Sequence, residues 1–190
     1  MVTLKGNLGL ALDMDEFWVF GYGSLMWNPG FAYVEQAPAL LKGYRRSLCV
    51  RSFVHRGTAE KPGLVLGLDR GGSCRGVAFR VAPENWSAAI DYLRERELVT
   101  NVYLERRLPV LLGDRRKVIA TTYVVDRHHP QYGGAMDAKV AARTVSTAHG
   151  RSGPNDAYVL NTLAHLQQMN IRDGWLEEVA DEVERLRRAA

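Results

Sequence analysis

A chain of 190 residues falls within the usual size of one compact domain, and 46% hydrophobic with 24% charged residues is an ordinary globular composition. The formal charge is +4, but basic and acidic residues alternate along the chain, which is typical of solvated helix faces and disfavours nucleic-acid binding. No apolar run approaches the roughly 18 residues that cross a bilayer, and no secretory cleavage site follows the N-terminus. We therefore expect a cytoplasmic protein without membrane or nucleic-acid partners.

The N-terminal segment differs from the rest of the chain. Residues 1–15 carry scattered charges before the first strand-like run, and we expect them to form a flexible extension. The remainder has no internal repeat, low-complexity stretch or linker that would divide it. Residues 16–190 are therefore predicted to form a single domain.

Short apolar runs alternate with turn residues from Phe17 to about Val125. Their β-branched and aromatic content, with glycine or aspartate between them, favours strands. The six runs are FWVFGYG (17–23), RRSLCVRSF (45–53), GLVLGLD (63–69), GVAFRV (76–81), RLPVLL (107–112) and VIATTYVV (118–125). The sequence thus predicts five or six strands in a curled sheet or barrel.

Helical periodicity replaces the strand pattern between Val81 and Thr100, where Pro83 and Glu84 suit the start of a helix. Two or three more helices are predicted after residue 136, over about 137–149, 155–169 and 174–188. The last carries an apolar stripe of Leu176, Val179, Val183 and Leu186. Such a stripe is typical of an amphipathic helix packed on a core.

Two glycines follow the first predicted strand, on either side of Tyr22. Glycine adopts positive φ and lets the backbone approach a ligand, so the N–H groups around Gly21 and Gly23 would be presented to an anion or a developing oxyanion. The segment lacks the Lys-Ser/Thr of a P-loop and the third glycine of a Rossmann fingerprint. A purely structural turn and a nucleotide site remain the alternatives.

Glu97 continues an apolar stripe of the first predicted helix, after Trp86, Ile90 and Leu93 at spacings of four, three and four residues. Apolar surroundings near a helix C-terminus would raise the pKa of this carboxyl toward the range useful for a general base. The alternative is that the helix ends before Glu97 and the side chain faces solvent. The neighbouring exposed arc is predicted to carry the solvated charges Arg94, Glu95 and Arg96.

Few other residues suggest chemistry. Tyr158 lies in the first turn of a predicted helix, where it either reaches a site at the helix end or packs in the core. The adjacent His128 and His129 lie in a proline-containing turn without a third ligand nearby, so we expect no metal site. Cys49 and Cys74 lie in strand-like runs outside any CxxC pair and are predicted to be buried free thiols.

Taken together, these segments resemble the ChaC family, the glutathione-specific γ-glutamylcyclotransferases. The matching segments are, in order, WVFGYGSLMWNP, KGYRRSLCVRS, HRGT, KPG, GVAFRV, YLRERE, DRHHPQY and SGPNDAYVL. They extend from the first strand to the C-terminal helices. The resemblance implies an α+β fold of the γ-glutamylcyclotransferase type, a small mixed β-barrel with packed helices.

The resemblance also implies roles for particular residues. Glu97 would be the catalytic acid/base, and Tyr158 a further hydrogen-bonding partner of the substrate. The substrate-binding loop would comprise Val19, Phe20, Gly21, Tyr22, Gly23, Ser24 and Leu25. The substrate's own α-amine would attack its γ-carbonyl and release 5-oxoproline, so no metal or cofactor is implied.

Substrate choice is less determined than reaction type, because the segment LVTNVYLE after Glu97 lacks the glycines that some relatives carry there. Glutathione is the expected substrate, and another γ-glutamyl amine is the alternative. A non-catalytic small-ligand binding module of the same fold is a second alternative. The sequence does not predict an oligomeric state.

Overall fold

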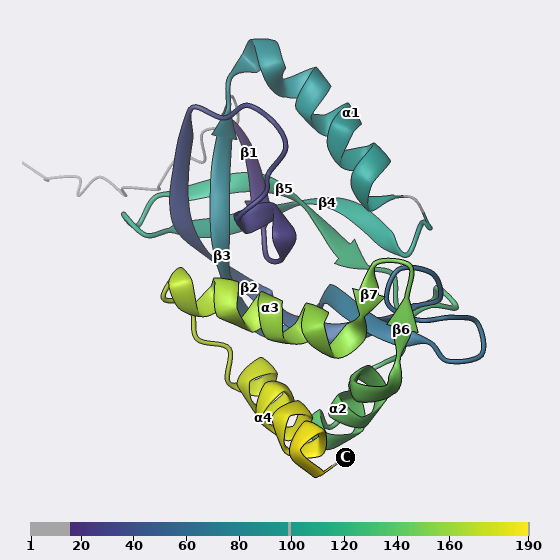
Figure 1. The fold of residues 1–190 in the computed structure, drawn as a ribbon. Coiled ribbons are helices and arrows are strands. Elements are labelled where there is room, and N and C mark those ends of the chain that lie inside the picture. Colours follow the sequence, from purple (N-terminus) through teal and green to yellow (C-terminus); the bar gives the residue numbers. More distant parts are fainter. Residues whose placement is uncertain (1–15, 99, 190) are drawn as a thin grey trace, which may run out of the picture.

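The computed structural model describes residues 16–98 and 100–189, so the extension expected over residues 1–15 lies outside the described part. Five strands form a closed barrel in the order β1-β3-β2-β4-β5. They are β1 (Phe17–Gly21), β2 (Glu35–Ser52), β3 (Gly63–Val81), β4 (Tyr103–Leu112) and β5 (Lys117–Val125). The helices around them are α1 (Trp86–Glu97), α2 (Ala138–Thr147), α3 (Asn155–Gln168) and α4 (Gly174–Ala189) (Figure 1). The predicted α+β barrel with packed helices is confirmed.

β1 closes the barrel between β3 and β5. It pairs antiparallel with β3 along its whole length and parallel with β5 through Trp18 and Val19. Successive side chains of a strand point to opposite faces, so Trp18 and Phe20 join the main core whereas Val19 joins a second cluster under α1. This doubly buried apolar strand fixes the position of the glycine turn that follows it.

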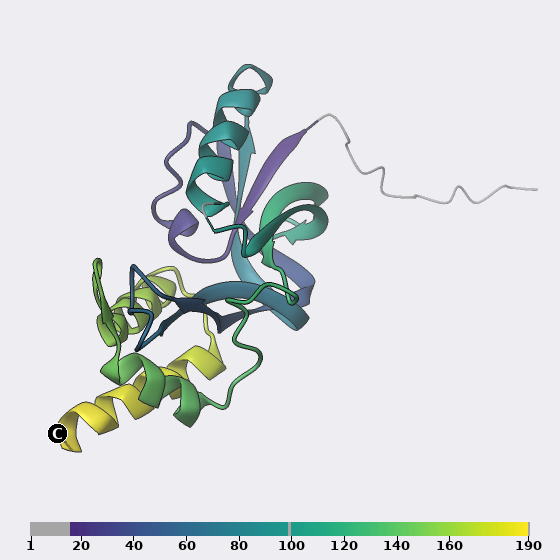
Figure 2. The same cartoon turned by 90° about the vertical axis from the view of Figure 1, so that its right-hand side faces the viewer.

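β2 and β3 form a long antiparallel ribbon that continues beyond the barrel (Figures 1 and 2). The separate runs 63–69 and 76–81 of the sequence belong to one strand, β3. Between them Gly71 and Gly72 have φ of 100° and 70°, and the register with β2 shifts at the facing Gly43, whose φ is 85°. These left-handed conformations favour glycine, and the glycines allow β3 to continue through the irregularity as one strand. The six apolar runs therefore form five barrel strands, within the predicted five or six.

α1 covers the barrel beside β1, as Figure 1 shows. A 3-10 turn over Pro83–Asn85 precedes it, consistent with the predicted start at Pro83. The apolar stripe is confirmed: Ile90 and Leu93 are buried, and Trp86 stacks on Phe17 with ring centroids 4.9 Å apart. The helix therefore extends to Glu97 with its apolar face against the barrel.

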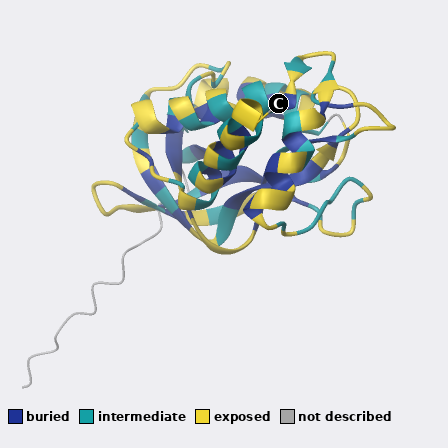
Figure 3. Cartoon of the chain, turned by 60° about the horizontal axis from the view of Figure 1, so that its bottom comes forward, coloured by how far each residue is buried: buried dark blue, intermediate teal, exposed yellow. Residues whose placement is uncertain are grey.

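The three C-terminal helices form a layer on the outer half of the ribbon. α4 buries the predicted stripe through Leu176, Val179 and Val183. Figure 3 shows exposed residues on the outward sides of these helices and buried residues on the inward sides. α2 ends two residues earlier than expected because His149–Gly150 forms a short strand, β6, that pairs with β7 (Gly153–Pro154).

Both cysteines are buried free thiols, as predicted. Burial raises the pKa of the Cys49 thiol to about 12 and that of Cys74 to about 11. The reactive thiolate is therefore disfavoured in both. Within the described ranges, none of the helices combines the length and apolarity that a membrane crossing needs.

Candidate active site

A small cavity of about 110 Å³ lies where the turn after β1, the end of α1, the first residues of β3 and the first turn of α3 meet. Its lining comprises Tyr22, Gly23, Ser24, Leu25, Val65, Leu66, Glu97, Tyr103, Tyr123 and Tyr158. The structure thus brings together six of the nine residues that the sequence proposes for the site, from three separate segments. The other three are Val19, Phe20 and Gly21.

Those three residues support the cavity without lining it. Val19 and Phe20 are buried in the two core clusters. A Cβ on Gly21 would lie 3.1 Å from the Cβ of Leu25. Gly21 therefore permits the close packing of the turn against the strand that leads into it.

The glycine turn does not use the positive φ that the sequence suggested. Neither Gly21 nor Gly23 belongs to the glycines with positive φ, and Gly23 has a φ of −133°. A Cβ on Gly23 would point toward Leu66, whose Cδ1 atom would be 3.8 Å away on the cavity wall. The absence of a side chain at Gly23 therefore keeps the cavity open. Space for a ligand, rather than a positive φ, explains why glycine occupies this position.

The turn that lines this space carries unpaired backbone N–H groups. Ser24–Met26 forms a 3-10 turn whose N-terminal end faces the cavity. Among the residues that the structure describes, the N–H groups of Gly23 and Ser24 have no protein acceptor within hydrogen-bonding distance. Adjacent unpaired amides of this kind suit an anionic oxygen.

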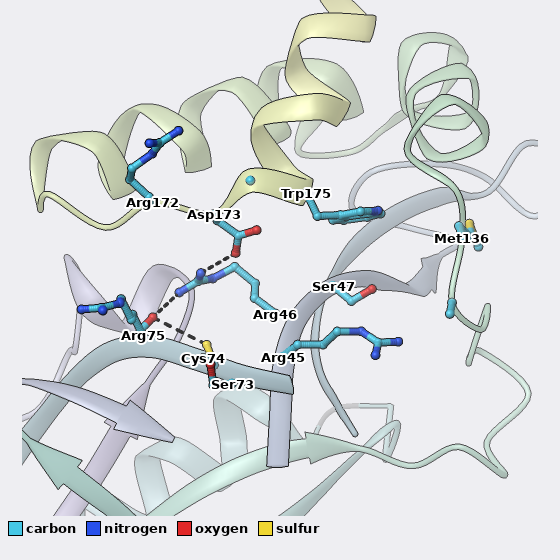
Figure 4. A pocket seen from close by; sticks show the side chains of 12 residues that line it. Arg45, Arg46, Ser47, Ser73, Cys74, Arg75, Met136, Arg172, Asp173 and Trp175 are labelled. Carbon is cyan, nitrogen blue, oxygen red and sulfur yellow. Dashed lines mark hydrogen bonds and ion pairs between the residues drawn. The ribbon is translucent and has the colours of Figure 1, made fainter. Parts of the chain in front are cut away.

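Arg46 holds the turn from behind, as Figure 4 shows for its contacts with Asp173 and Arg75. Its side chain is only 3% exposed, and its Nε donates to the carbonyl oxygen of Tyr22 at 2.6 Å. The two terminal nitrogens donate to Asp173 and to the carbonyl of Arg75, each at 2.7 Å. The sequence reasoning missed this residue, because its partners lie far away in the chain.

Glu97 is the only carboxylate in the cavity lining. Its side chain is 19% exposed, and one of its oxygens lies 3.3 Å from Nε of Arg96. Burial raises the pKa of Glu97 above its ordinary value, and the attraction of Arg96 opposes this in part. The pKa shift has the upward direction that the helix stripe predicted, which is the direction that favours a general base.

Arg96 is not the solvated charge that helical periodicity predicted. The side chain is 21% exposed and donates to Ser24 Oγ at 2.9 Å, to Tyr92 OH at 3.0 Å and to the carbonyl of Asn28 at 2.8 Å. Periodicity describes one helix alone, whereas here the glycine turn packs over the last turn of α1. Arg96 therefore joins the end of α1 to the glycine turn.

The tyrosines form the opposite wall. Tyr103 donates its hydroxyl to the carbonyl of Leu66 at 2.7 Å, and the Leu66 N–H donates to the Tyr158 hydroxyl at 3.2 Å. Burial raises the pKa of both hydroxyls, which keeps them protonated. Tyr158 thus reaches the site, whereas Tyr103 and Tyr123 were missed because alternation in a strand does not identify the cavity that a side chain faces.

A larger cavity of about 430 Å³ surrounds Arg46 on the other side of the turn (Figure 4). It contains neither Glu97 nor the open amides, and its carboxylate, Asp173, is already paired with Arg46. We therefore place the candidate site in the smaller cavity. In the described ranges, no three His, Cys, Asp or Glu side chains are arranged to hold a metal ion.

Comparisons with known proteins show which proteins this chain is similar to. A glutathione-specific gamma-glutamylcyclotransferase of Escherichia coli K12 is 34% identical over 184 residues, covering 97% of this chain and 80% of that protein. A glutathione-specific gamma-glutamylcyclotransferase 1 of Mus musculus is 34% identical over 178 residues, covering 90% and 79%. A crystal structure of a gamma-glutamyl cyclotransferase specific to glutathione from yeast has a TM-score of 0.80 at 23% identity, covering 90% and 99% of the two chains.

The yeast structure supports the fold, and the sequence relatives extend the similarity to nearly the whole chain. A family model described as ChaC-like protein matches residues 17–186. This range contains the glycine turn, Glu97 and Tyr158. The chain therefore belongs to the ChaC-like protein family.

Proposed function

We propose that this protein is a γ-glutamylcyclotransferase that converts glutathione into 5-oxoproline and cysteinylglycine. The observation that carries the proposal is the presence, within one cavity, of a single partly buried carboxylate, Glu97, together with the open amides of Gly23 and Ser24. The relatives from Escherichia coli and Mus musculus are named for this activity on glutathione.

The substrate supplies its own nucleophile. Its α-amine folds back on the γ-carbonyl, a bond forms between that nitrogen and the carbonyl carbon, and the bond to the cysteinyl nitrogen breaks. An α-amine with a pKa of about 8 is mostly protonated at neutral pH, so a base is required before attack. Glu97 takes protons from the α-nitrogen and returns them to the departing nitrogen, and its raised pKa strengthens it as the base for the first transfer.

The open amides supply electrostatic stabilisation. N–H groups of Gly23 and Ser24 either bind the oxygen of the γ-carbonyl as it gains negative charge or hold the α-carboxylate of the substrate. A donor of the first kind contributes on the order of a hundredfold in rate. In both arrangements, Arg46 and Arg96 fix the turn that presents the amides. The tyrosine hydroxyls remain neutral donors on the facing wall.

Incubation of the purified protein with reduced glutathione tests the proposal. We expect 5-oxoproline and cysteinylglycine in equal amounts, and slower product formation from γ-glutamylalanine. Faster release from γ-glutamylalanine would identify a cyclotransferase for another γ-glutamyl amine. Binding of glutathione without product would identify the non-catalytic module, and thermal stabilisation by ATP would identify a nucleotide site.

Some expectations from the sequence stay predictions. They are the cytoplasmic location, the absence of nucleic-acid and membrane partners, and the division into an extension over residues 1–15 and a single domain over residues 16–190.

A further inference from the structure

The cavity is too small for the whole substrate that the proposed function requires. Pockets that enclose a drug-sized ligand measure roughly 300–1,000 Å³, whereas this one measures about 110 Å³. The γ-glutamyl group fits inside, and the cysteinylglycine part extends past the rim. Two residues extend by at most about 7 Å. The glycyl carboxylate of glutathione therefore reaches the cavity's immediate surroundings.

Three arginines lie around the cavity, and two of them are already neutralised. Arg46 pairs with Asp173, and Arg96 pairs with Glu97. Arg56, on the loop between β2 and β3, forms no ion pair with any described carboxylate. Of these three arginines it is therefore the one whose charge is not balanced by a described carboxylate.

Arg56 lies against the wall of the site. Its guanidinium carbon is 5.1 Å from the ring centroid of Tyr158, whose hydroxyl group bonds Leu66 within the cavity lining. One terminal nitrogen donates to the carbonyl of Ser152 at 2.5 Å. A guanidinium has five N–H donors in a fork that suits a carboxylate, so further donors remain for a ligand.

The backbone around Arg56 is held tightly by the packing of glycines. A Cβ on Gly57 would clash with the backbone nitrogen of Gly63, and a Cβ on Gly63 would clash with the carbonyl of Arg56. A Cβ on Gly150 would lie 2.6 Å from the Arg56 nitrogen. The Arg56 N–H also donates to Ser52 Oγ at 3.0 Å. A loop fixed in this way loses little freedom when its side chain binds a ligand.

We propose that Arg56 determines substrate specificity by binding the terminal glycyl carboxylate of glutathione, an inference that rests on the proposed function. The γ-glutamyl group would occupy the cavity at Glu97, and the rest of the tripeptide would pass Tyr158 to the guanidinium. The reaction type depends on Glu97, and the preference for a γ-glutamyl peptide with a distant carboxylate depends on Arg56.

Steady-state kinetics with two substrates test this. Glutathione carries the carboxylate, and its glycine monoethyl ester does not. For the unmodified protein we expect kcat/KM to be about 10- to 100-fold higher for glutathione, as for a charge-assisted hydrogen bond. Arg56→Gln should lower kcat/KM for glutathione by a similar factor, mainly by raising KM. The same substitution should change kcat/KM for the ester by less than about threefold. Arg151→Gln, an exposed arginine in the neighbouring β6–β7 turn, is the matched control and should keep the preference.

Three outcomes would overturn the inference and leave the proposed function intact. They are equal use of both substrates by the unmodified protein, retention of the full preference by Arg56→Gln, and equal losses on both substrates in this variant, which would make Arg56 a structural residue. Failure of the proposed function is distinguishable, because the unmodified protein would then release 5-oxoproline from neither substrate.

Discussion

Replacing Glu97 by glutamine should remove catalysis while preserving substrate binding. Glutamine keeps the shape of the side chain and an oxygen that accepts from Arg96, but it does not take up a proton at neutral pH. No other carboxylate lines the cavity, so no second base is available within its lining. Because positioned general bases contribute about 10²- to 10⁴-fold, we expect kcat to fall by that factor with KM changed little.

The assay measures 5-oxoproline formation across glutathione concentrations, with Glu95→Gln as the control. Glu95 is two residues away on the same helix and exposed, so its neutralisation should leave turnover near normal. A Glu97→Gln protein that turns over glutathione at nearly the unmodified rate would refute the assignment of the base.

The Glu97→Gln substitution should also change how the stability of the protein depends on pH. Burial raises the pKa of Glu97 in the folded state. Below the ordinary Glu pKa of about 4.3, the carboxyl is neutral in both the folded and the unfolded protein. As pH rises through the raised pKa, the folded protein has to bury a charged carboxylate and therefore loses stability. Glutamine carries no such charge. The melting temperature of Glu97→Gln relative to the unmodified protein should therefore be higher at pH 7 than at pH 4. A relative melting temperature that falls over this range would contradict the burial of the charged form.

Two further substitutions test the support of the site. Gly23→Val places a side chain toward Leu66, so calorimetry should show loss of glutathione affinity in a folded protein, and unchanged affinity would mean that the cavity is misassigned. Arg46→Met leaves Asp173 and the Tyr22 carbonyl without their buried partner, which should cost about 3–5 kcal/mol of unfolding free energy in urea titrations. Arg45→Met removes a side chain that is 42% exposed and 3.4 Å from the buried Asp69, which keeps its bonds to Arg127 and Tyr132. This variant should cost under about 1 kcal/mol, and losses equal to those of Arg46→Met would argue against a special role for Arg46.

The sequence predicted the parts of this protein that depend on local pattern. The spacing of Trp86, Ile90 and Leu93 placed Glu97 on the buried face of α1 because a helix that packs on a barrel needs one apolar side. The strands could be predicted because strands buried in a barrel consist largely of apolar residues between turns. The polar start of β2, from Glu35, was missed because its partly exposed side chains break the apolar pattern and only pairing with β3 makes it a strand.

The site's supporting residues could not be predicted in this way. Arg46 meets Tyr22 and Asp173 only after the ribbon, the first strand and α4 are assembled. Arg96 was interpreted as solvated because the helix pattern contains no information about the turn that covers its end. Both depend on contacts between segments far apart in the chain, which neither periodicity nor composition encodes.

The parallel pairing of β1 with β5 has a consequence for the protein's biosynthesis. During synthesis, β1 is made before β5, and the barrel closes only after both strands are available to pair. The turn that follows β1 then still lacks the contact between Arg46 and Asp173, because Asp173 lies beyond β5 in the chain. Non-local pairings of this kind form late in folding. A chain whose synthesis stops before α4 therefore lacks the Arg46–Asp173 contact that holds the glycine turn.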